Sequence, residues 1–251
     1  MKRIALAAAA ALLLYTPAKS DAIGVEVSIG MWEHDPSGWI EYPTGSDRID
    51  LDDDLGLGTD SELYFKGKLE HPIPMLPNLM LAYTKNRNDG TGTISRSFNF
   101  GRFTFTASEE IYTKTQLDSY DATFYYEVLD AAAFDLDLGL TLRYIDGYAE
   151  VTSLTTGLSD RADFDVILPL AYANAEIPLP FPGLEAAISG SGITYDSNTL
   201  YDIEAALRYR LAMGLGLEGG YRAQKIEIDD VDDTSADIDI DGFFFGVNWE
   251  F

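Results

Sequence analysis

This 251-residue sequence contains only two histidines and no cysteine, so it offers few candidates for chemistry that depends on an imidazole or a thiol. His34 is followed directly by Asp35, and such a pair could act as acid and base at an exposed rim. His71 stands before Pro72, in a segment expected to be a tight turn. No nucleophile elbow, phosphate-binding loop or zinc motif occurs. We therefore expect no enzyme and no cofactor, with a rim protease using His34 and Asp35 as the remote alternative.

The chain is strongly acidic, with 42 acidic residues, 17 basic residues and a net charge of −25. Nucleic acid is excluded as a partner, because phosphate binding needs a basic face. Asp237, Asp239 and Asp241 alternate with apolar residues, and the segment up to Gly242 matches the opening of a calcium loop. However, Asn248 stands where that loop requires a bidentate glutamate. The three aspartates are therefore a candidate for only weak binding of a divalent cation.

The elements that must position these residues are predicted to be strands. Apolar residues recur at every second position in ten segments between Ile23 and Phe251, whereas a helix would need them three and four apart. One such segment is assigned Leu168, Leu170 and Tyr172 on its apolar face. Long polar stretches and tight turns alternate between the segments, as in outer-membrane barrels. An aromatic girdle is expected from residues at the ends of the apolar faces: Tyr83, Tyr126, Tyr144, Tyr172, Tyr209, Tyr221 and Trp249.

The N-terminus indicates export. Lys2 and Arg3 precede an apolar run that is too short to span a membrane, and Ser20-Asp21-Ala22 has the small-x-small pattern of a cleavage site. Residues 1–22 are therefore expected to be a signal peptide that is removed.

The fold class expected for residues 23–251 is all-β, a ten-stranded antiparallel transmembrane β-barrel in the outer membrane of a Gram-negative bacterium. Its mean hydropathy of −0.06 is then the average of an apolar outer face and a polar inner face. Long acidic outer loops are expected at about 33–59, 87–117 and 229–236. A secreted β-sandwich is the soluble alternative, and the aromatic girdle and the charged polar faces disfavour it.

The last segment resembles the C-terminal assembly signal of bacterial outer-membrane proteins, which ends in an aromatic residue. Three other stretches, 70–78, 125–130 and 142–147, have the sequences EHPIPMLPN, YYEVLD and LRYIDG. Together they resemble a family of small proteobacterial outer-membrane β-barrel proteins without an assigned activity. The resemblance implies fold, location and recognition by the barrel-assembly machinery, and it carries over no catalytic residue. The signal residues are Phe243, Phe245, Val247, Trp249 and Phe251.

If the apolar faces contact lipid, charges of both signs line the lumen. Unpaired charges in a narrow interior are costly, so an ion-pair network is expected. Barrels of about eight strands are filled by their own side chains, and about sixteen strands are needed for an open channel. The expected role is therefore structural or at the cell surface with a closed lumen; the alternative is a narrow, cation-preferring, porin-like pore. The predicted network is Glu26, Glu62, Lys66, Lys68, Glu127, Asp137, Arg143, Glu185, Glu204, Arg208, Glu218 and Arg222.

Two outer features complete the prediction. The change from acidic to apolar residues at Gly242 is expected to mark the outer edge of the bilayer, where Asp237, Asp239 and Asp241 would share divalent cations with lipopolysaccharide phosphates. The stretch 97–106 alternates about Gly101-Arg102, which predicts a hairpin. Its four phenylalanines would either pack on the barrel rim or bind a partner.

Overall fold

A computed structural model describes residues 23–251 except 74, 132 and 232. The predicted signal peptide lies outside the described residues. No helix in the described part of the chain is long and apolar enough to cross a membrane. The strands are β1 (Gly24–Glu41), β2 (Ile49–Asp50), β3 (Asp60–Glu70), β4 (Asn78–Thr84), β5 (Arg87–Thr93), β6 (Phe98–Phe100), β7 (Phe103–Phe105), β8 (Glu110–Ala131), β9 (Phe134–Ser153), β10 (Ser159–Pro178), β11 (Leu184–Tyr195), β12 (Asn198–Arg210), β13 (Leu215–Val231) and β14 (Thr234–Glu250).

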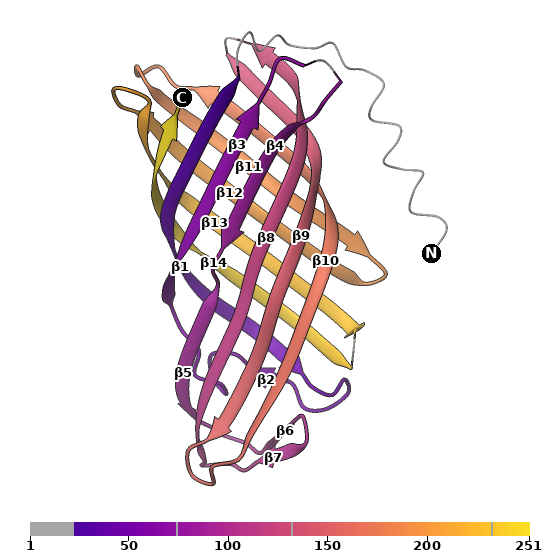
Figure 1. The fold of residues 1–251 in the computed structure, drawn as a ribbon. Coiled ribbons are helices and arrows are strands. Elements are labelled where there is room, and N and C mark those ends of the chain that lie inside the picture. Colours follow the sequence, from indigo (N-terminus) through magenta and orange to yellow (C-terminus); the bar gives the residue numbers. More distant parts are fainter. Residues whose placement is uncertain (1–22, 74, 132, 232) are drawn as a thin grey trace.

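The strands form one closed antiparallel barrel (Figure 1). Its wall has ten positions, which we call staves, each filled by one strand or by two consecutive strands. Each stave pairs with the stave that follows it in the chain. The barrel closes where β14 pairs with β1, from Glu26–Glu250 to Glu41–Ser235. β4 and β5 form a single stave, because both pair with β8. β2 pairs only with the outer end of β1, and β6 and β7 make a separate hairpin. The predicted ten-stranded antiparallel barrel is confirmed.

The connections differ between the two ends of the barrel. The end near the C-terminus has short links, such as the proline-containing turn at 179–183 between β10 and β11. The opposite end carries residues 42–59 and 94–109, and it also holds β2, β6 and β7 (Figure 1). The predicted hairpin at 97–106 is confirmed, with Phe100 opposite Phe103 and with Gly101 at φ 58° in the turn.

The staves extend further than the loops expected from the sequence. Residues 33–41 continue β1, 87–93 form β5, and 110–117 belong to β8. In place of a loop at 229–236, β13 runs to Val231 and β14 begins at Thr234. These polar stretches pair with neighbouring staves beyond the apolar belt, where strand pairing does not require an apolar face.

Stave β10 corrects one predicted face. Leu170 and Tyr172 point into the barrel and are 0% and 8% exposed, whereas Ile167 on the outer face is 68% exposed. Leu170 lies opposite Thr141, which is also buried inside. The prediction that Leu168, Leu170 and Tyr172 face lipid is therefore wrong. Alternation could not assign the faces, because both faces of β10 are apolar between residues 167 and 173.

Candidate functional site

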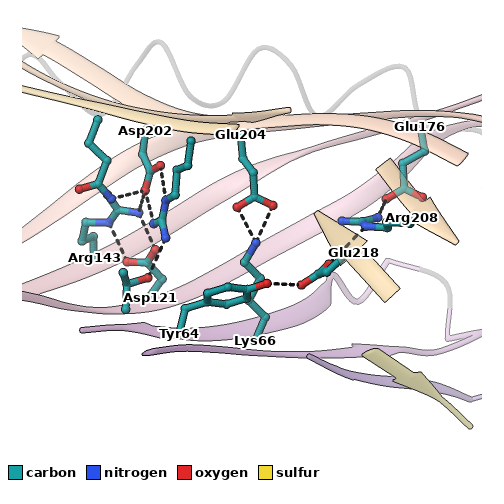
Figure 2. A network of polar contacts seen from close by, with 12 residues as sticks. Tyr64, Lys66, Asp121, Arg143, Glu176, Asp202, Glu204, Arg208 and Glu218 are labelled. Atoms are coloured by element: carbon teal, nitrogen blue, oxygen red, sulfur yellow. Dashed lines mark hydrogen bonds and ion pairs between the residues drawn. The ribbon is translucent and has the colours of Figure 1, made fainter. Parts of the chain in front are cut away.

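The centre of the barrel interior is occupied by one aspartate between two arginines (Figure 2). Asp202 on β12 lies 2.7 Å from Arg143 of β9 and 2.6 Å from Arg222 of β13. Arg143 also reaches Asp121 on β8 at 2.6 Å, and Arg222 donates to the Thr84 hydroxyl. All four charged side chains are at most 11% exposed, so four staves are connected across the interior.

A second layer lies beside the first. The Lys66 ammonium on β3 donates to both carboxylate oxygens of Glu204 on β12, at 2.7 and 2.6 Å. Tyr64 on the same stave donates its hydroxyl to Glu218 of β13 at 2.6 Å (Figure 2). Both bonds cross the interior between staves that are not neighbours in the wall.

Two glycines make room for the Tyr64 ring. A Cβ on Gly30 would lie 2.5 Å from the ring, and a Cβ on Gly246 would lie 2.3 Å from its hydroxyl oxygen. Gly30 and Gly246 face each other on β1 and β14, so the tyrosine lies flat against bare backbone. Any larger residue at either position would push the ring away from Glu218.

A third layer surrounds Arg208 of β12. Its guanidinium lies 2.7 Å from Glu176 on β10, 3.7 Å from Glu218 and 3.8 Å from Glu185. Lys68 lies 3.7 Å from Glu176, and it is also 3.7 Å from Glu26. We refer to the residues of the three layers as the lumen network: Glu26, Tyr64, Lys66, Lys68, Asp121, Arg143, Glu176, Glu185, Asp202, Glu204, Arg208, Glu218 and Arg222.

The structure brings nine of the twelve residues expected in the lumen into these layers and places the other three at their margins. Glu62 pairs instead with Lys85 at 2.7 Å. Glu127 accepts a hydrogen bond from Asn78, and Asp137 accepts one from Asn174.

Four members of the lumen network were missed from the sequence. Asp121 and Asp202 lie on the polar faces of their segments, and that parity was the signal that could have included them. Glu176 was missed because the face of β10 was misassigned, which turned it outward. Tyr64 was missed because a tyrosine on a polar face carries no charge pattern.

The interior is filled along its middle and open at one end. A cavity of about 70 Å³ remains beside the three layers, with Thr123 and Thr141 among its lining residues. At the end near the C-terminus a cavity of about 720 Å³ opens, and its wall carries more acidic than basic side chains. We call this second cavity the acidic vestibule; its charged lining residues are Glu26, Lys68, Glu70, Glu127, Asp130, Asp135, Asp137, Glu176, Glu185, Arg208, Arg210 and Glu250.

The opposite end is closed by apolar side chains. Residues 42–59 and 94–109, which we call the loop cap, bring their apolar side chains against the inner faces of β8 and β9. Gly101 and Arg102 at the hairpin tip lie on Asp160 of β10, and the Arg102 backbone N–H lowers the pKa of that carboxyl. Of the four hairpin phenylalanines, three are at most 1% exposed, so the hairpin packs against the rim. The buried cluster is Ile49, Leu51, Leu55, Leu57, Ile94, Phe98, Phe100, Phe105, Ile111 and Val151.

The two histidines are not arranged as a rim acid–base pair. His34 lies within β1 and is 0% exposed, with its ring 4.8 Å from that of Trp32. Asp35 is the next residue of the same strand and is exposed, because successive side chains of a strand point to opposite faces. His71 lies at the other end of the barrel, where its Nε2 contacts the Pro77 carbonyl at 3.2 Å. The expectation that His34 lies in an outer loop is therefore wrong.

The three aspartates of β14 do not form a metal group. Lys225 on β13 donates to both Asp237 and Asp239, and these bonds raise the pKa of the lysine. Asp241 instead accepts the hydroxyl of Tyr221. Among the described residues no group of three or more carboxylates or histidines could hold a metal ion. The candidate divalent-cation site at Asp237, Asp239 and Asp241 is therefore corrected to an ion pair with Lys225, since the lysine already occupies the space between two of them.

The outer surface of the barrel carries a belt of exposed apolar side chains. On β14 the assembly-signal residues alternate outward, with Phe243 58% and Phe245 70% exposed. The girdle residues are also outside, except Tyr172. Such an area of exposed apolar surface is stable only in lipid, and the pairing of β1 with β14 closes the barrel that carries it. The fold is that of an outer-membrane β-barrel.

Three solved structures of bacterial proteins are similar to this chain. The outer-membrane protease OmpT of Escherichia coli superimposes with a TM-score of 0.51 at 13% identity, over 95% of this chain and 100% of that one. The translocator domain of the autotransporter NalP of Neisseria meningitidis gives 0.46 at 10% identity, over 91% and 88% of the chains. Ail of Yersinia pestis gives 0.39 at 12% identity, over 91% and 99%.

No family model and no curated protein sequence matches the chain. Membership of the unassigned proteobacterial family therefore stays a prediction. The likeness to OmpT shows the fold alone.

Proposed function

We propose that this protein is a non-catalytic, integral outer-membrane barrel with a structural or surface role and a lumen closed by ion pairs. The observation that carries the proposal is the central layer of the lumen network. Asp202 and its two arginines connect opposite walls at distances of 2.6 and 2.7 Å, and the space beside them is only about 70 Å³. That volume holds only a few water molecules.

The charges support closure because their number is balanced locally. Arg143 and Arg222 face Asp121 and Asp202, so the central layer has no net charge. A balanced, desolvated group of this kind resists ion entry, since a passing ion would have to replace partners that are already matched. The non-catalytic part of the proposal is supported by the position of His34, which is buried within a stave and hydrogen-bonds to no described residue.

Assembly into the outer membrane is part of the same proposal. An outward row of apolar side chains lies on β14 and directly after it, formed by Phe243, Phe245, Val247, Trp249 and Phe251. This row fits recognition by the barrel-assembly machinery and then contact with lipid and lipopolysaccharide.

Single-channel recording in planar bilayers tests the closed lumen. The purified protein, shown to be folded by a heat-modifiable gel shift, is expected to give no conductance steps. Steady conductance from the folded protein would overturn the proposal.

The acidic vestibule favours a second candidate, a narrow cation-preferring pore. Nine of its twelve charged lining residues are acidic, and the cavity opens at the end expected to face the periplasm. In this case the recording would show small steps with reversal potentials that favour potassium over chloride.

A further inference from the structure

One stretch of the barrel wall has a free edge. β10 pairs with β9 along Ser159–Glu176, but it pairs with β11 only along Ala171–Pro178. No described strand pairs with the edge of β10 that faces β11 from residue 159 to residue 170. Backbone donors and acceptors on that edge therefore have no ladder partner.

The free edge follows from two local features. Pro169 carries no N–H and stops the ladder where β11 would otherwise continue along β10. The β11–β12 hairpin then turns at Asp196 and Ser197, which both have positive φ, whereas β10 runs on towards the loop cap (Figure 1).

Across the gap, β13 also continues beyond its neighbour. Its last pair with β12 is Glu227–Thr199, yet the strand runs to Val231. The outer wall thus lacks two strands between β10 and β13. This leaves a notch of three inter-strand spacings, about 14 Å.

The floor of the notch is apolar. Phe164 and Val166 of β10 share the inward parity of Leu168 and lie opposite Gly147 and Ile145. They remain 40% and 36% exposed and lie beyond the last β10–β11 pair, Ala171–Gly192.

The outer rim of the notch is acidic. Asp163 is paired with Arg161 at 2.6 Å, whereas Asp165 forms no salt bridge among the described residues. On the other side, Glu227 and Asp229 are likewise without a salt bridge in the described part of the chain.

We propose that the free edge of β10, residues 161–168, binds an extended peptide segment of a partner protein in which basic and apolar residues alternate. The unpaired backbone would extend the sheet by one strand. Apolar side chains of the peptide would lie on Phe164 and Val166, and its basic side chains would face Asp165. A second copy of this chain fits less well, because each copy carries a net charge of −25.

The probe is a fluorescent (Lys-Val)5 peptide added to the folded protein in detergent micelles, with (Glu-Val)5 as the comparison. Hydrogen exchange should slow about tenfold or more at the alternate amides of 161–168 that face the free edge when the peptide is saturating. Two further peptides, N-methylated on all lysine or all valine amides, block opposite strand edges. One of them should bind and the other should not.

Asp165→Lys should raise the Kd for (Lys-Val)5 about fivefold or more, which is the effect expected from the loss of one cross-strand charge pair. The matched control is Glu33→Lys on β1, an exposed acid whose stave is paired on both sides, and this change should alter the Kd less than about twofold. Heat-modifiable mobility verifies that both variants fold.

Equal binding of (Glu-Val)5, equal binding of both methylated peptides, or unchanged exchange at 161–168 would each overturn the proposal. Protection of 161–168 that rises with protein concentration in the absence of peptide would also overturn it, because the occupant would then be a second copy.

Discussion

Halfway along the barrel the interior is filled by paired charges, whereas at the outer end it is filled by apolar side chains of the loop cap. Asp202, Arg143 and Arg222 belong to three staves, so the wall and the central layer of the lumen network are built from the same strands. Leu55 and Phe100 of the cap belong to connecting segments that pack on the wall from within. We therefore expect the lumen network to contribute to the stability of the barrel, and the cap to open while the barrel stays folded.

Removing the central carboxylate should have the largest effect. Asp202→Ala leaves two buried guanidinium groups without their shared partner, and we expect a loss of about 3–5 kcal/mol in the free energy of unfolding. Urea unfolding in lipid vesicles, followed by tryptophan fluorescence, measures it. Asp239→Ala, on the outer surface, should cost less than about 1 kcal/mol. Equal stability of the two variants would show that the central layer does not hold the wall together.

A cap substitution should have a smaller effect that stays local. Leu57 is 2% exposed, and Leu57→Ala should cost about 3 kcal/mol through the cavity it leaves. Because the cap has its own cluster, residues 42–59 and 94–109 should become protease-sensitive while heat-modifiable mobility is unchanged. Leu63→Ala, on the lipid-facing side of β3, is the control and should leave protease sensitivity as it was. If Leu57→Ala lowered the urea midpoint of the whole barrel, the separation of the two regions would be wrong.

Acidification should have the smallest effect on the cap, and there it should act through Asp160. Asp160 accepts the backbone N–H of Arg102, which lowers the pKa of the carboxyl, so its contribution is complete above about pH 4, the usual aspartate value. The contribution is lost as pH falls through the lowered pKa. Proteolysis of the hairpin by an acid protease should therefore accelerate below about pH 4 in the wild type. In Asp160→Asn the rate of proteolysis should change less over the same pH range. An identical pH profile in the two proteins would show that Asp160 does not hold the hairpin in place.

The sequence was informative where one face of a strand meets lipid. Period-two patterns predicted ten staves and an outward row ending in Trp249 and Phe251, because lipid requires apolar residues at every second position. They failed on β10, where apolar residues fill both faces, and this error also hid Glu176. The loop-cap core was not predictable in the same way, because Leu55 and Ile94 follow no strand period and meet only in the folded chain.

The sequence also could not predict which charged residues pair with each other inside the lumen. Parity places Lys66 and Glu204 inside, but only the barrel's shear decides that they meet across the interior at 2.6 Å. The notch was not predictable either, because it depends on a single residue and on strand lengths. Pro169 ends the pairing of β10 with β11, and β10 continues further than β11.

Single-channel recording on a cap-opened barrel tests the central claim most directly. Phe98→Ala with Phe100→Ala removes two fully buried rings from the loop cap and leaves every residue of the lumen network in place. If ion pairs close the barrel across the membrane, this variant should show no conductance steps in planar bilayers, like the wild type. Steady conductance after opening the cap would show that the apolar cap is the closure, and it would contradict the account.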